Sequence, residues 1–166
     1  MFAPRFSHSP APHSPAPHSP APHSQAPFIG TMAELAQLAA SRRRSKLVLC
    51  VDDDRSIRDI VKHCLKEAGY PVLNCRDGEL ALTMLTRFQP SIVLLDIDMP
   101  ELDGVQTLAE MRRRFPDLRP KVVFLTGRRS IDDLRSAKSV GGDDYMIKPF
   151  TRANLVRRVD RWAGLI

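Results

Sequence analysis

A chain of 166 residues with a net charge of +6 has room for one domain, or for a smaller domain with a tail. Residues 1–46 carry a charge balance of +4, while the remaining 120 residues carry 20 basic and 18 acidic side chains. The expected folded part is therefore nearly neutral and gives no argument for nucleic-acid binding. No apolar stretch reaches the ~18 residues of a membrane span, and the N-terminus lacks the apolar core of a secretory signal, so we expect a cytoplasmic protein. Cys50, Cys64 and Cys75 lie in apolar runs and indicate buried free thiols, without disulfide or zinc spacing.

The N-terminal residues 8–27 repeat a five-residue unit, three times as His-Ser-Pro-Ala-Pro and once as His-Ser-Gln-Ala-Pro. Alternating prolines favour an extended polyproline conformation with little to bury. Four of the five histidines lie in this repeat, but a metal site would need a fold to hold its ligands. We therefore expect residues 1–45 to be a disordered tail and basic linker, with the folded domain at residues 46–166. The basic run at 41–46 is interpreted as a solvated linker.

Five short apolar runs predict the strands of this domain. They cover residues 47–51, 72–75, 92–95, 121–125 and 145–147. The third run reads Ile-Val-Leu-Leu, as in a strand buried on both faces, and ends abruptly in Asp96.

Helical periodicity fills the segments between these runs. The apolar face of the first helix includes Ile60, and that of the second includes Phe88. Start and stop signals accompany the pattern: Gly69 ends the first helix, and the expected N-terminal caps of later helices are Asp77, Asp103, Ser130 with Asp133, and Thr151. Strands alternating with helices predict an α/β fold, a doubly wound, flavodoxin-like (βα)5 domain. Its parallel five-stranded sheet has the strand order 2-1-3-4-5.

Polar side chains occur at the carboxyl ends of these strands, which meet at one edge of a parallel sheet. Asp52 and Asp53 follow the first strand, Asp96 ends the third, and Thr126 and Lys148 end the fourth and fifth. Three crowded carboxylates favour a cation, and oxygen-only ligands suit Mg²⁺. One carboxylate could act as a nucleophile toward phosphorus, with the lysine and threonine compensating the phosphoryl oxygens. Any one of these residues could be an ordinary cap or surface side chain, but the combination argues against that.

Over residues 46–164, this pattern resembles the receiver domain of bacterial two-component response regulators. The motifs that carry the resemblance are Asp52-Asp53, the Leu-Asp-Ile-Asp-Met-Pro-Glu-Leu-Asp-Gly segment around Asp96, Thr126-Gly127, and Gly-Gly-Asp-Asp-Tyr at 141–145 leading to Lys148-Pro149-Phe150.

The resemblance implies a phosphoacceptor regulator that assists its own phosphorylation and dephosphorylation and is not an enzyme in the ordinary sense. The implied roles are Asp96 as phosphoacceptor; Asp52, Asp53, Asp96 and the backbone carbonyl of Asp98 as Mg²⁺ ligands; Thr126 and Lys148 as phosphoryl-binding residues; Thr126 and Tyr145 as the switch pair; and Pro149 as a cis-proline.

The implied partners are a sensor histidine kinase or histidine phosphotransferase, and a separate downstream protein that binds the face between Ile131 and Trp162. A homodimer is also compatible with the resemblance. Only four residues follow Trp162, so we expect a stand-alone receiver without a nucleic-acid-binding domain.

The sequence allows two alternative hypotheses. The Asp96-Ile97-Asp98 sequence is similar to the paired aspartates of haloacid-dehalogenase-type phosphatases, but in that family the second acidic pair follows the nucleophile. Here Asp52 and Asp53 precede it. The other reading is a binding module that works through its basic tail, which would show salt-sensitive nucleic-acid binding that requires residues 1–46.

Overall fold

The computed structural model describes Gln37, residues 41–127 and residues 139–166, all within the second of two units, which spans Thr31–Ile166. Five parallel strands form one sheet in the order β2-β1-β3-β4-β5. Their bounds are β1 Val48–Val51, β2 Val72–Cys75, β3 Ile92–Asp96, β4 Lys121–Thr126 and β5 Asp144–Ile147. The predicted fold class and strand order are confirmed.

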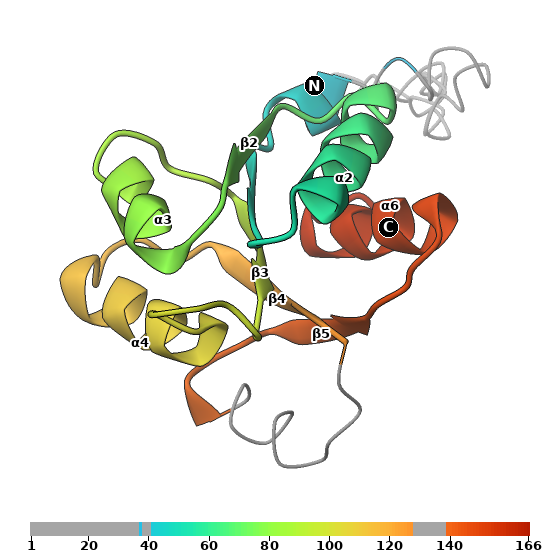
Figure 1. The fold of residues 1–166 in the computed structure, drawn as a ribbon. Helices are drawn as coiled ribbons and strands as arrows, with labels where there is room; N and C mark the ends of the chain where they lie inside the picture. Colours follow the sequence, from blue (N-terminus) through green and yellow to red (C-terminus); the bar gives the residue numbers. More distant parts are fainter. Residues whose placement is uncertain (1–36, 38–40, 128–138) are drawn as a thin grey trace, which may run out of the picture. The chain divides into compact units, whose positions relative to one another are not determined.

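Helices cover both faces of the sheet (Figure 1). Their bounds are α2 Arg55–Glu67, α3 Gly78–Leu85, α4 Gly104–Arg114 and α6 Arg152–Trp162. The first and last of these pack together on one face, and α3 and α4 on the other. The fourth predicted helix, with its caps Ser130 and Asp133, lies outside the described residues.

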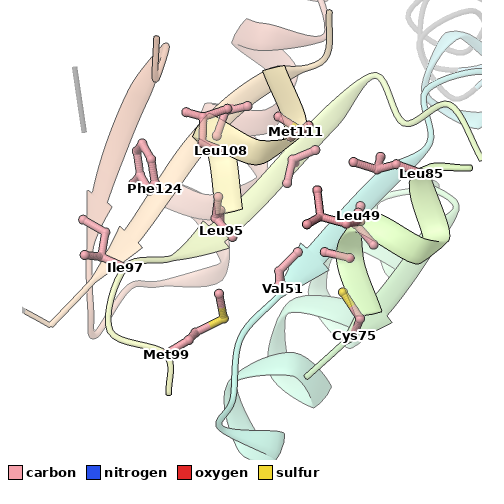
Figure 2. Close-up of a cluster of buried hydrophobic side chains, with 14 residues drawn as sticks. Leu49, Val51, Cys75, Leu85, Leu95, Ile97, Met99, Leu108, Met111 and Phe124 are labelled. Carbon is pink, nitrogen blue, oxygen red and sulfur yellow. The ribbon is translucent and has the colours of Figure 1, made fainter. Parts of the chain in front are cut away.

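The sheet separates two apolar clusters, which explains why its central strands β1 and β3 read as apolar runs. Figure 2 shows the cluster under α3 and α4, where Leu49, Leu95 and Phe124 of neighbouring strands face Leu108 and Met111. The other cluster joins the opposite face of the strands to α2 and α6. Because helices cover both faces of the sheet in the described part of the chain, we looked for a functional site where the strands end.

Side-chain caps set the beginnings of these helices. Asp77, Asp103 and Thr151 each accept a hydrogen bond from a backbone N–H of the first turn, as predicted, and Asp54 does the same for α2. Two apolar expectations are wrong: Ile60 is 48% exposed and Phe88 is 42% exposed. Ile60 lies beside the buried stripe of α2, and Phe88 comes after the end of α3.

The basic run at 41–46 is only partly a solvated linker. Residues 41–44 are helical, and the Arg43 guanidinium donates two hydrogen bonds to the Asp160 carboxylate of α6, at 2.9 and 2.6 Å. Arg43 is therefore packed against the domain, contrary to that interpretation. Among the described residues, none of the helices combines the length and apolarity that crossing a membrane requires.

Candidate functional site

Three carboxylates gather at the carboxyl ends of β1 and β3, which are neighbouring strands in the sheet. Asp52 and Asp53 directly follow β1, and Asp96 is the last residue of β3. Each offers an oxygen atom, and these atoms lie within 4.8 Å of one another. Asp52 and Asp96 are buried, whereas Asp53 is exposed to solvent. The site is therefore an acidic cluster at the rim of the sheet, with two inner acids and one outer acid.

Lys148, which follows β5, brings an ammonium group into this cluster. Its Nζ lies 2.7 Å from Asp52 Oδ2 and 3.0 Å from Asp96 Oδ1. The peptide bond from Lys148 to Pro149 is cis. Burial lowers the pKa of Lys148, but its contacts with the two carboxylates outweigh this and raise the pKa overall. The lysine is thus held as a cation between two acids.

Burial dominates the electrostatics of Asp96. It raises the pKa of the Asp96 carboxyl, the hydrogen bond and charge of Lys148 oppose the rise, and the Asp52 charge adds to it. The backbone N–H of Asp98 also donates to Asp96. The net effect is that the pKa of Asp96 lies above its ordinary value.

The donor set fits a hard divalent cation. Three carboxylates face one ammonium group, so the cluster keeps an excess of negative charge. Asp52 Oδ2 is buried, and the Lys148 ammonium lies 2.7 Å from it. One ammonium group does not neutralise three carboxylates, and oxygen-only ligands of this kind are those that Mg²⁺ takes.

Thr126 and Tyr145 lie on β4 and β5, the two strands that follow β3 in the order of the sheet. Thr126 ends β4, is fully buried, and accepts a backbone hydrogen bond from Lys148 N–H at 2.8 Å. Tyr145 stands opposite Phe124 in the parallel register of β4 and β5, and 44% of it is exposed. The structure therefore brings Asp52, Asp53, Asp96, Thr126 and Lys148 to one rim of the sheet, while Tyr145 lies within β5 and is exposed.

Two residues that contribute to the site were not predicted for that role. A Cβ on Gly104 would lie 2.1 Å from the carbonyl oxygen of Asp96, so only glycine lets the start of α4 approach β3 this closely. Arg58 Nη1 donates to the carbonyl oxygens of Asp52 and Asp53, at 2.6 and 2.9 Å. Gly104 ends the motif around Asp96, but its close approach to the Asp96 carbonyl could not be seen from the motif, and Arg58 acts on carbonyl oxygens, which a side-chain motif does not record.

Comparison with known proteins adds an independent line of evidence. PrrA, a transcriptional regulatory protein of Mycobacterium tuberculosis, is 39% identical over 115 residues, which are 69% of this chain and 48% of PrrA. The chain thus spans about half the length of the curated relatives it matches. The chemotaxis protein CheY4 of Vibrio cholerae is 30% identical with a TM-score of 0.67, covering 70% of this chain and 97% of CheY4.

A further solved structure carries a metal. The receiver domain of the sensor histidine kinase PA1611 from Pseudomonas aeruginosa has a magnesium ion coordinated in its active-site cleft, and it is 30% identical with a TM-score of 0.66 over 72% of this chain and 98% of that domain. The family model described as response regulator receiver domain matches residues 48–160, which include all the strand-end residues discussed above. The chain therefore belongs to the response regulator receiver domains, a signalling family of two-component systems.

Proposed function

We propose that this chain is a phosphoacceptor of a two-component or phosphorelay system, with Asp96 as the residue that is phosphorylated. The observation that carries the proposal is the position of the Asp96 carboxylate, at the end of a central strand and 3.0 Å from the Lys148 ammonium. Asp52 and Asp53 lie close enough to share a cation with it. A nucleophile, a fixed cation and a cation-binding acid pair are the components that phosphoryl transfer to a carboxylate requires.

In this proposal the phosphoryl donor is a phosphohistidine of a sensor histidine kinase or a histidine phosphotransferase. A carboxylate oxygen of Asp96 forms a bond to phosphorus while the phosphorus–nitrogen bond breaks, and the departing imidazole nitrogen takes its proton from solvent. The raised pKa of Lys148 keeps its ammonium charged, so that it can follow the negative charge from the carboxylate to the phosphoryl oxygens. The Thr126 hydroxyl is proposed to donate to another of these oxygens.

Asp52, Asp53 and Asp96 would hold Mg²⁺ together with the backbone carbonyl of Asp98. When bound, the ion supplies positive charge that offsets both the clustered carboxylates and the incoming phosphoryl oxygens. The chain's own contribution is the geometry: the carboxylate oxygens lie within 4.8 Å of one another before any ion arrives.

We also propose an output surface on β5 and α6, within the expected face between Ile131 and Trp162. A groove there is lined by Tyr145, Phe150 and Asn154 and by three arginines, Arg157, Arg158 and Arg161. Arg158 is paired with Asp144, so the arginines that favour an acidic partner are chiefly the other two. Inward movement of Thr126 toward a phosphoryl group would open space that the exposed Tyr145 ring can occupy.

Labelling with acetyl phosphate tests the phosphoacceptor assignment. The wild-type chain should gain one acid-stable, base-labile phosphoryl group, and only with a divalent cation present. Asp96→Asn should reduce labelling to background, while the matched variant Asp117→Asn, at an exposed position after α4, should keep it. Undiminished labelling of Asp96→Asn in mass spectra of the intact protein would contradict the assignment.

A further inference from the structure

One guanidinium nitrogen bridges the backbone of both acids that follow β1. Arg58 Nη1 lies 2.6 Å from the carbonyl oxygen of Asp52 and 2.9 Å from that of Asp53. Arg58 belongs to the early part of α2 and is half-buried. The first helical hydrogen bond of α2 runs from Arg58 N–H to the Asp54 carbonyl, so the two bridged carbonyls lie just before the helix.

Arg58 is itself tied to the neighbouring strand. Its carbonyl oxygen accepts a hydrogen bond from Asn74 Nδ2 at 3.0 Å, and Asn74 stands opposite Cys50 in the register of β1 and β2. The loop is also fixed at the Asp52 end, where the Asp52 N–H donates to the Cys75 carbonyl at 3.2 Å. The β1–α2 loop, α2 and β2 are therefore linked around one arginine.

We propose that Arg58 is a positioning residue that presets Asp52 and Asp53 for a divalent cation. The inference rests on the proposed cation-binding role of this acidic pair. Adjacent carboxylates repel one another, so an unrestrained loop would separate them and lose free energy on cation binding when they are brought back together. Fixing both carbonyls limits the backbone rotations of both residues, and the carboxylates keep their mutual geometry.

The charge of Arg58 acts in the opposite direction to its hydrogen bonds. A cation beside the acidic pair repels an incoming Mg²⁺, so removing the charge alone would tighten Mg²⁺ binding. Removing the hydrogen bonds would weaken it. Because the two effects differ in sign, the direction of the change identifies which of them dominates.

The experiment is a Mg²⁺ titration of the full chain at fixed ionic strength, followed by amide shifts in NMR spectra. Arg58→Met should raise the Kd for Mg²⁺ by about tenfold, the lower end of what loss of a supporting hydrogen bond costs in metal affinity. Arg58→Gln, which also lacks the charge but keeps an N–H donor, should have a lower Kd for Mg²⁺ than Arg58→Met. The matched control is Arg55→Met, which removes the same charge from the exposed start of α2, where Arg55 Nε lies 3.6 Å from Asp59 Oδ2.

Each outcome bears on the proposal. A raised Kd in Arg58→Met with an unchanged or slightly lowered Kd in Arg55→Met supports positioning, and so does partial recovery in Arg58→Gln. A Kd in Arg58→Met no higher than in Arg58→Gln overturns it, because both variants lack the charge and only Arg58→Gln keeps a donor. If Arg58→Met does not fold, Arg58→Lys decides, because it keeps the charge and removes the bridging guanidinium: wild-type affinity overturns positioning, and a raised Kd supports it. A wild-type chain that does not bind Mg²⁺ would overturn the proposed cation site itself, which separates that failure from failure of the Arg58 inference.

Discussion

Asp160 is a buried carboxylate far along the chain from the acidic cluster, and it connects the two ends of the described domain. It accepts hydrogen bonds from Arg43 and, at 2.5 Å, from the Tyr70 hydroxyl. Burial raises the pKa of Asp160, but the hydrogen bonds and charge of its partners outweigh this and lower the pKa overall. The family model matches residues 48–160, so this ion pair joins Arg43, which lies before the matched segment, to Asp160 at its end.

Arg43→Ala should lower the free energy of unfolding by about 2 kcal/mol at neutral pH, because it leaves a buried carboxylate without its charged donor. The folded pKa of Asp160 is lowered, so its contribution to stability is complete above the unfolded value of about 3.9 and is lost as the pH falls through the folded value. The difference between wild type and Arg43→Ala should therefore shrink in acid. Urea unfolding at several pH values measures it.

The control for this prediction is Arg44→Ala, which removes the same charge from the next position, where the arginine is exposed. Surface substitutions of this kind usually change stability by less than about 0.5 kcal/mol. Equal losses in the two variants would show that general charge, and not the Asp160 pair, accounts for the effect.

At the scale of elements, the strands and helix caps could be predicted because each has a local cause. A strand covered on both faces must be apolar at every position, and a helix start needs a side-chain acceptor. The exposure of Ile60 could not be predicted. Helical spacing shows which side chains share the apolar face of α2, but not how much of that face the sheet covers. Phe88 was misplaced because the end of α3, at Leu85, depends on packing beyond the sequence pattern.

Some residues of the candidate site could likewise be predicted from the sequence, and others could not. Parallel strands place their carboxyl ends together, so strand-end residues such as Asp52, Asp96 and Lys148 could be expected to converge. Arg58 and Gly104 could not, because their partners are carbonyl oxygens that every residue possesses. Their importance follows only from how closely α2 and α4 approach the rim.

The elements of the proposed output surface are joined by one acid at the start of β5. Asp144 accepts from Arg158 Nη1 at 2.8 and 2.7 Å and from Trp162 Nε1 at 2.8 Å, both of α6. Burial raises the pKa of Asp144, but these donors outweigh it and lower the pKa overall. A displacement of β5 is therefore expected to reach α6.

Thr126→Ala tests whether the phosphoryl group reaches these elements through Thr126. With beryllofluoride bound at Asp96, the wild-type chain should show amide shifts concentrated in β5 and α6. The variant should still accept phosphate at Asp96 but lose most of the shifts in those two elements, since the hydroxyl that would move is absent. The control is Thr83→Ala on α3, whose hydroxyl bonds only within its helix at the Glu79 carbonyl. Activation shifts found mainly in α2 and α3 would contradict the proposed surface.

At the scale of the whole molecule, the chain combines a domain of ordinary composition with an N-terminal repeat that has few apolar side chains to bury. The contact of Arg43 with α6 shows that the described domain begins before β1. Two truncations can therefore separate the repeat from the basic run that follows it.

Deleting residues 1–31 should change Tm by no more than about 2 °C and leave the phosphorylation rate unchanged, because that segment's composition offers little to pack. Deleting residues 1–46 should lower Tm by roughly 5–10 °C, because it also removes Arg43 and leaves Asp160 buried with Tyr70 as its remaining donor. Thermal unfolding followed by circular dichroism measures both. Introducing Arg43→Ala into the shorter truncation should reproduce most of the loss in the longer one. If the shorter deletion alone causes the large fall, the repeat itself contributes to the folded domain, contrary to this prediction.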